Sequence, residues 1–264
     1  MIKLNAFQLK MVAIIGMISS HMVIAWWGII PMWLAFPMYA AGGLTFPIMG
    51  YFVAQGYAYT SNLKKYILRV LIFGVVALPF HIITITLPMS GFPLTVSYPF
   101  FNIMFNIVVG LLVLRMYEKI KSRVLFWILF VVVIAPLSLV LLEWYFVGIV
   151  MVMMAHLIKN ETLRRVVPPL FAAVFFVGIG FSLNMTTSPE IMDTITDAGF
   201  DLPRLLDTSF IPVQQSFPIG MVVAALLLKS YNGERGRKSK WIFYIVYPVH
   251  FIVLAIVGFM LGTL

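Results

Sequence analysis

Long runs of apolar residues dominate the chain, and short polar, basic or proline- and glycine-containing stretches separate them. A helix crosses the hydrocarbon core of a bilayer with about 20 apolar residues, so each run of this length predicts one transmembrane helix. Strands of a membrane β-barrel would be about 10 residues long and strictly alternating, which these runs are not. The pattern predicts nine helical spans: Leu9–Ile30, Phe36–Tyr59, Tyr66–Leu87, Pro99–Tyr117, Val124–Leu142, Trp144–Ile158, Val166–Leu183, Phe210–Leu228 and Trp241–Leu264.

Composition supports this interpretation. Of the 264 residues, 62% are hydrophobic and only 10% are charged, whereas soluble domains carry about 25% charged residues. A water-soluble fold of this size has too little interior to hide so much apolar surface. We therefore expect one all-α domain over residues 1–264, a polytopic bundle of transmembrane helices. The absence of cysteine excludes disulfides, cysteine-ligated zinc and a cysteine acyl-enzyme.

The distribution of charge predicts the orientation of the spans. With nine spans and a cytoplasmic N-terminus, 17 of the 18 Lys and Arg residues and three of the nine acidic residues lie inside, a net charge of +14. The outer side then carries Arg204 and six acidic residues, among them Glu143, a net charge of −5. Basic residues concentrate on the cytoplasmic side of membrane proteins. We therefore expect a cytoplasmic N-terminus and an external C-terminus, and the overall charge of +9 indicates topology rather than nucleic-acid binding.

Two histidines are predicted near the middle of the bilayer. His21 lies roughly 18 Å past Leu9, and His250 lies roughly 14 Å past Trp241. A neutral imidazole exchanges a proton near neutral pH, so these histidines are candidates for a general base. The alternative is a hydrogen bond between helices. For His81, which follows a proline, we favour a structural role.

Other polar side chains at membrane depth either line a cavity or join helices. The candidates for lining a cavity are Ser20, Gln55, Asn102, Asn106 and Tyr247. Asn102 and Asn106 share one helix face because they are four residues apart. A Ser–His nucleophile is disfavoured because adjacent helical residues point about 100° apart. No HxH, HxxxH or HExxH spacing occurs, so we predict no metal site.

The inner connection Tyr231–Gly236 has the composition of a tight, open turn, with Asn-Gly followed by a second glycine. Exposed backbone N–H groups and neighbouring basic residues suit a phosphate group. From spacing alone we favour the alternative, a simple basic turn on the cytoplasmic side, because the stretch is neither a P-loop nor a GxGxxG motif.

Four stretches together resemble the TraX family, polytopic bacterial membrane proteins named for the acetylase of conjugative F-type pilin. They are Leu9–Met17 with Ser20-His21, Phe46–Ile48 through Gln55–Tyr57 to Arg69, Asn102–Phe105 with Gly110–Leu112, and Tyr231–Gly236 followed by Phe243-Tyr244, Tyr247-Pro248 and His250. The last stretch is the most specific, and the region 124–215 adds little. The family commonly has an Asp before the first-span histidine, where this chain has Ser20.

The resemblance implies transfer of an acetyl group from cytosolic acetyl-CoA to an amine, in the founding case the N-terminus of a pilin subunit. A hydroxyl acceptor stays open, as does the choice among peptide, sugar and lipid. On this expectation the protein is a multi-pass N-acetyltransferase of the bacterial cytoplasmic membrane, surrounded by lipid. His21 or His250 would act as the base. The phosphates of CoA would bind Lys64, Lys65, Arg69, Asn232 and Arg235.

Two other functions are compatible with the sequence. A transporter or channel fits a chain of many spans rich in proline and glycine, although no Asp or Glu lies within a predicted span to couple ions or protons. A structural assembly or immunity partner would show neither transfer nor transport.

Overall fold

The computed structural model describes residues 3–87, 101–186, 210–237 and 240–264. The predicted connection Pro88–Tyr98 lies outside these ranges, and so do Arg204 and five of the acidic residues assigned to the outer side. Within them the chain is helical, as predicted. In order, the elements are α1 (Ala6–Ala25), α2 (Met32–Gly42), α3 (Thr45–Tyr59), α4 (Leu63–His81), a π-helical turn η1 (Ile82–Thr86), α6 (Ile103–Lys119), α7 (Arg123–Leu129), a second π-helical turn η2 (Phe130–Ile134), α8 (Ala135–Leu141), α9 (Tyr145–Leu157), α10 (Glu161–Thr186), α12 (Ile211–Gln214), α13 (Phe217–Lys229) and α14 (Lys240–Leu261).

Polar residues just before the apolar runs determine where several helices begin. Asn5 caps α1 in a capping box, accepting from the backbone N–H of Gln8 while the Gln8 side chain accepts from the Asn5 N–H. Asn62, Asn102 and Ser122 accept hydrogen bonds at the starts of α4, α6 and α7. Such caps satisfy backbone donors that the first helical turn leaves without partners.

Seven helical segments of the described chain are long and apolar enough to cross a membrane. They are Ala6–Ala25, Met32–Tyr59, Leu63–Thr86, Arg123–Leu141, Glu161–Gly180, Ile211–Lys229 and Trp241–Leu261. The two remaining predicted spans form α6 and α9, of 17 and 13 residues, which are shorter than a usual span. The protein is therefore an all-helical membrane protein, while the count of nine spans and their sidedness stay predictions.

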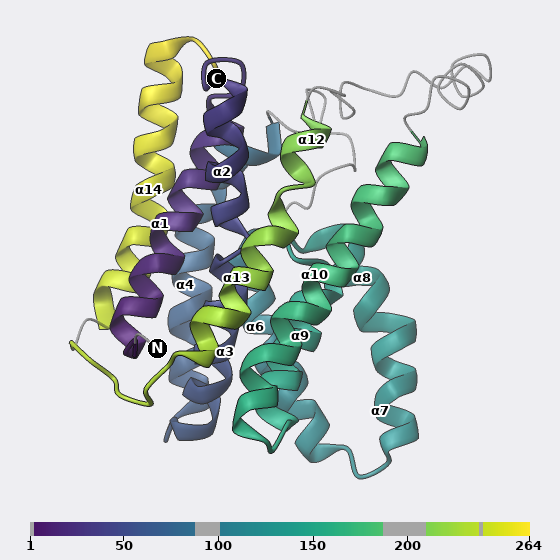
Figure 1. Cartoon of the computed structure of the whole chain (residues 1–264). Helices are drawn as coiled ribbons and strands as arrows, with labels where there is room; N and C mark the ends of the chain where they lie inside the picture. The colour runs from purple at the N-terminus through teal and green to yellow at the C-terminus, as the bar shows by residue number, and fades with distance from the viewer. Residues whose placement is uncertain (1–2, 88–100, 187–209, 238–239) are drawn as a thin grey trace.

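The start of α1 and the end of α14 lie at opposite ends of the bundle (Figure 1). At the N-terminal end, the backbone of Leu4 accepts from Asn232 N at 2.9 Å and donates to Ser230 O at 3.0 Å. These bonds place the connection 231–237 beside the start of α1. Elsewhere in the bundle, the backbone N–H of Phe101 donates to Leu141 O, which joins the start of α6 to the turn between α8 and α9.

Glycines allow α1, α2 and α13 to pack with their backbones in contact. A Cβ atom added to Gly16 would overlap the carbonyl oxygen of Ala41, and one added to Gly220 would overlap the carbonyl oxygen of Ala40. Small residues are the usual means by which membrane helices approach this closely. The three helices therefore have a fixed spacing around their shared contact.

This packing gives a stability prediction. Gly220→Ala should lower the free energy of unfolding by about 1–3 kcal/mol, because α13 must move away from α2 to accommodate the methyl group. The measurement is thermal unfolding of the purified protein in detergent. Gly178→Ala in α10 is the matched control, since nothing lies within 4 Å of its added Cβ. Equal effects of the two substitutions would contradict the proposed close packing.

Candidate functional site

The two histidines predicted to lie at similar depths are in direct contact. His21 of α1 and His250 of α14 are both buried, and His21 Nδ1 lies 2.8 Å from His250 Nε2. Their rings are nearly parallel, with 5.1 Å between centroids. Phe251 packs against both rings.

The hydrogen bonds around this pair determine which nitrogen of each neutral ring carries the hydrogen. His250 Nδ1 lies 3.1 Å from the carbonyl oxygen of Val246. A carbonyl only accepts, so Nδ1 of His250 carries a hydrogen and Nε2 of the neutral ring is an acceptor. His21 Nδ1 must then donate to that nitrogen, which leaves His21 Nε2 as the nitrogen that can take up a proton.

A buried carboxylate faces this nitrogen. Glu143 lies in the turn between α8 and α9, and its side chain is only 10% exposed. Glu143 Oε1 is 3.8 Å from His21 Nε2, and Oε2 is 3.7 Å from His81 Nε2. Oε2 also accepts a 2.8 Å hydrogen bond from the backbone N–H of Ile103, in the first turn of α6. Charge counting had assigned Glu143 to the outer surface, so this burial corrects the sequence interpretation.

The surroundings of Glu143 favour its ionised form. Burial acts to raise its pKa, but the contact with His21, the charges that His81 and His21 carry when protonated, and the Ile103 N–H together hold the pKa below its ordinary value. The positive end of the α6 dipole acts in the same direction. The site therefore combines a carboxylate with an imidazole that can become an imidazolium.

Asn106 holds the turn that carries Glu143. Its Oδ1 accepts from Trp144 N and its Nδ2 donates to Tyr145 O, both at 3.0 Å. Tyr145 has a positive φ of 48°, a conformation that residues with a side chain rarely adopt. Asn106 was predicted to line a cavity, and the structure shows it bonded to backbone instead.

His81 stands at the end of α4, where the chain changes to the π-helical turn η1. Because of this turn, Thr86 Oγ1 approaches His81 Nδ1, at 3.5 Å. Single π-helical turns are frequent at functional sites. The sequence favoured a structural role for His81, yet its Nε2 faces Glu143.

The other residues predicted to line a cavity have mixed positions. Ser20 lines the cavity at His21, although its hydroxyl donates to Met17 O. Asn102 donates to Gly74 O and caps α6. Gln55 donates to the hydroxyl of Tyr51, away from the histidines. Tyr247 is buried, and its ring packs on those of His250 and Phe251.

Two cavities meet at Glu143. One, of about 40 Å³, is bounded by residues of α1, α2, α3, α6, α13 and the 143–144 turn, including His21 and Glu143. The other, of about 120 Å³, is bounded by residues of α2, α10, α12, α13 and the 143–145 turn, including Tyr39, Tyr145 and Gln214. A molecule in either cavity can therefore contact the carboxylate of Glu143.

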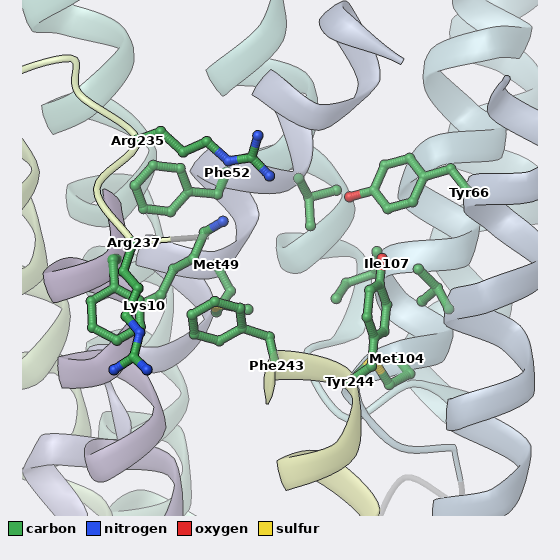
Figure 2. Close-up of a pocket in the computed structure, with 13 residues that line it drawn as sticks. Lys10, Met49, Phe52, Tyr66, Met104, Ile107, Arg235, Arg237, Phe243 and Tyr244 are labelled. Atoms are coloured by element: carbon green, nitrogen blue, oxygen red, sulfur yellow. The ribbon is translucent and has the colours of Figure 1, made fainter. Parts of the chain in front are cut away.

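A third pocket lies nearer the N-terminal end of the bundle. It measures about 180 Å³ and has largely aromatic and aliphatic walls. Figure 2 shows its three cationic side chains, Lys10, Arg235 and Arg237, on one side and Tyr66 and Tyr244 across from them. Lys10 Nζ lies 4.7 Å from the ring centroid of Phe52 and 5.2 Å from that of Phe243.

An ion pair on α10 holds the connection that supplies these arginines. Arg165 donates to Tyr231 O at 2.9 Å and lies 2.7 Å from Glu161. Glu161 also accepts from the Tyr51 hydroxyl at 3.0 Å. The start of the 231–237 connection is therefore attached to α3 and α10.

The predicted phosphate-binding residues divide into two groups. Arg235 lines the pocket, and Arg69 interacts electrostatically with its wall residues Tyr66 and Tyr244. Within the described chain, Arg69 Nε is buried and has no hydrogen-bond partner. Lys64 lines a separate groove, Lys65 is exposed, and Asn232 bonds to Glu234 within the loop. Lys10 was not among the predicted residues, and Arg237 was predicted only as one of the basic residues beside the 231–236 turn.

No group of three or more His, Asp or Glu residues in the described ranges is arranged to hold a metal ion. The direct bond between His21 and His250 occupies two ring nitrogens that a metal would need. The arrangement is suited to proton transfer.

Glu143→Gln tests the electrostatic role of the carboxylate. The substitution should lower the free energy of unfolding by about 1–3 kcal/mol at pH 7, because it removes a charge held by buried partners. A lowered folded-state pKa stabilises the fold above the unfolded value of about 4.3, and this contribution is lost as the pH falls further. The difference between the wild type and Glu143→Gln should therefore shrink below about pH 4.3.

Thermal unfolding in detergent from pH 7 downwards measures this difference. Glu234→Gln is the control, because Glu234 is exposed in the 231–237 connection. A stability difference that does not change with pH would show that the carboxylate charge has no stabilising role.

Comparison with known proteins gives two matches. The profile of the family described as "TraX protein" matches residues 6–258. A protein of Dichelobacter nodosus, described as "Probable fimbrial assembly protein FimC, serogroup H1", is 26% identical, and the alignment covers 96% of this chain and 95% of that protein. No solved structure matches the chain.

Proposed function

The chain belongs to the TraX family, as its motifs predicted, and on that premise we propose that it transfers an acetyl group from acetyl-CoA to an amine or hydroxyl acceptor. The observation that carries the proposal is the chain of contacts from His250 through His21 to Glu143 beside a cavity. In this proposal, these contacts leave His21 Nε2 as the nitrogen that accepts a proton during the reaction. The alternative of a transporter has no comparable support.

The pocket near the N-terminal end is the proposed donor site. The phosphates of CoA carry several negative charges, and Lys10, Arg235 and Arg237 offer positive charge on one side of the pocket. Charged hydrogen bonds of this kind are strong, and arginine suits phosphate geometry. The buried Arg69 Nε, which lacks a partner in the described chain, adds a donor beside the pocket wall.

The donor pocket and the cavity at His21 share three lining helices, α1, α3 and α6. Thr45 lines the cavity and Met49 lines the pocket, one turn further along α3. On α6, Ile103 lines the cavity at His21, and the adjacent Met104 lines the donor pocket. One turn of helix is about 5.4 Å. A donor extended along the bundle could therefore bring its thioester from the pocket to His21.

The proposed reaction is direct transfer with His21 as the base. The nitrogen or oxygen of the acceptor attacks the thioester carbonyl carbon, and His21 Nε2 takes the proton that the acceptor loses. The C–S bond breaks, and the proton passes to the thiolate of CoA. His250 keeps Nδ1 of His21 protonated, and Glu143 stabilises the imidazolium, so both position the base.

The relative from Dichelobacter nodosus is named for fimbrial assembly. This name favours a peptide acceptor, such as a pilin-like N-terminus, over a sugar or a lipid. We place the reaction in the bacterial cytoplasmic membrane, with the basic pocket on the side where acetyl-CoA is found.

Substitution of the base tests the mechanism. His21→Ala should reduce acetyl transfer by about 10²–10⁴-fold, because a positioned base contributes that much. The measurement is transfer of labelled acetyl from acetyl-CoA to membranes that contain the acceptor. His156→Ala is the control, since His156 lies at the end of α9, beside Glu118.

Full activity of both His21→Ala and His250→Ala would refute the mechanism. Flux of a substrate across liposomes without consumption of acetyl-CoA would instead establish a transporter.

Substitution of the basic residues tests the donor site. Arg235→Ala should raise the KM for acetyl-CoA about tenfold or more with little change in kcat, because a charged hydrogen bond is worth about 1.5–3 kcal/mol. Lys64→Ala is the matched control, because it removes one positive charge from a separate groove. A larger effect of Lys64→Ala than of Arg235→Ala would place the donor in that groove.

A further inference from the structure

The cavity at His21 has about the size of an acetyl group. Its volume is about 40 Å³, and a cavity of about 10–15 Å³ is needed to hold one water molecule. The cavity therefore accommodates about three non-hydrogen atoms. An acetyl group has three, its two carbons and the carbonyl oxygen.

The walls of the cavity lie directly around the reacting nitrogen. Met17 and Ile24 are four residues before and three residues after His21, so all three share one face of α1. Ile103 forms another part of the wall, and its backbone N–H holds Glu143. Apolar side chains thus limit the space available beyond the carbonyl carbon of a bound thioester.

The wall formed by α2 and α13 cannot easily move outwards to enlarge the cavity. Gly42 lines the cavity, and a Cβ added to it would overlap Ser20 and lie 3.0 Å from the Phe217 ring. On the same helices, an added Cβ on Gly16, Gly43 or Gly220 would overlap backbone atoms of a neighbouring helix. Because these backbones are already in contact, α1, α2 and α13 form a rigid boundary.

We propose that this cavity selects the acyl chain, with Met17, Ile24 and Ile103 restricting the donor to a two-carbon acyl group. The inference rests on the proposed acetyl transfer and deepens it, since it assigns residues that determine specificity. Longer chains would have to displace these side chains, separate helices that are in backbone contact, or pass the Glu143 carboxylate to reach the adjoining cavity of about 120 Å³. Placing apolar methylenes against a buried carboxylate is unfavourable because it deprives the charge of polar partners.

A series of donors tests the wild-type protein. Membranes of the native cells supply the acceptor, membranes lacking the protein give the background, and release of the CoA thiol is measured with acetyl-, propionyl- and butyryl-CoA. We expect kcat/KM to fall by at least about tenfold for each added methylene, the lower end of the range for one methylene in a fitted apolar pocket.

Enlarging the cavity should relax this selection. Met17→Ala removes three non-hydrogen atoms from the wall, so butyryl-CoA should become a substrate within about threefold of acetyl-CoA, a loss of the usual discrimination. Met153→Ala is the matched control, because Met153 is an equally buried methionine of α9 outside this cavity. The milder Ile24→Val and Ile103→Val each remove one carbon and should admit propionyl-CoA, which keeps the test valid if Met17→Ala fails to fold.

The outcomes separate this inference from the proposed function. A wild type that uses butyryl-CoA as well as acetyl-CoA would refute the inference alone, and so would cavity variants that keep the wild-type preference. A wild type that releases thiol from none of the three donors would refute the acetyl transfer on which the inference rests.

Discussion

The burial of the Glu143 carboxylate is the constraint on which the rest of the site depends. A charge removed from water must be compensated by partners with good geometry, or the fold loses stability. Here the partners come from three separate helices: His21 on α1, His81 on α4 and the Ile103 N–H on α6. One carboxylate thus determines how segments distant in sequence must meet.

Several unusual local features become understandable from this requirement. The strained backbone of Tyr145 and the two amide bonds of Asn106 hold a turn that directs Glu143 inwards rather than towards the membrane surface. The π-helical turn after His81 brings Thr86 close to Nδ1, while Nε2 faces the carboxylate. Strain and irregular helix geometry persist where the surrounding contacts hold them in place.

The elements of the fold could be predicted from sequence because the bilayer imposes a length and a composition on each helix. The depths of His21 and His250 followed from helix rise, which is a local property. Glu143 could not be found in this way, since a count of charges assigns every connecting residue to a surface. One signal was present: Glu143 is the single charged residue between two long apolar runs, with almost no loop around it. Ser20 precedes the first-span histidine, and Glu143, distant in sequence, places a carboxylate beside the same ring.

Sequence reasoning named Arg235 but not Lys10 as a residue of the basic pocket, for a related reason. Basic clusters such as Lys64-Lys65 are conspicuous in sequence, but on a helix adjacent residues point in different directions. Lys10 is a lone cation in an apolar run, and it reaches the same pocket as Arg235 and Arg237 only because the 231–237 connection packs beside the start of α1. Tertiary contact, not local density of charge, assembles this surface.

The two ends of the site have opposite charge, and this asymmetry would orient a donor in the proposed reaction. Positive side chains surround the pocket near the N-terminal end, while the cavity beyond it contains the negative Glu143. In the low dielectric of a helix bundle, repulsion between like charges is strong. A polyanion such as CoA would therefore keep its phosphates among the cations, and only its uncharged thioester end could approach His21. The charges at the two ends of the site would thus determine the orientation and depth of the bound donor before its reacting carbon makes any contact.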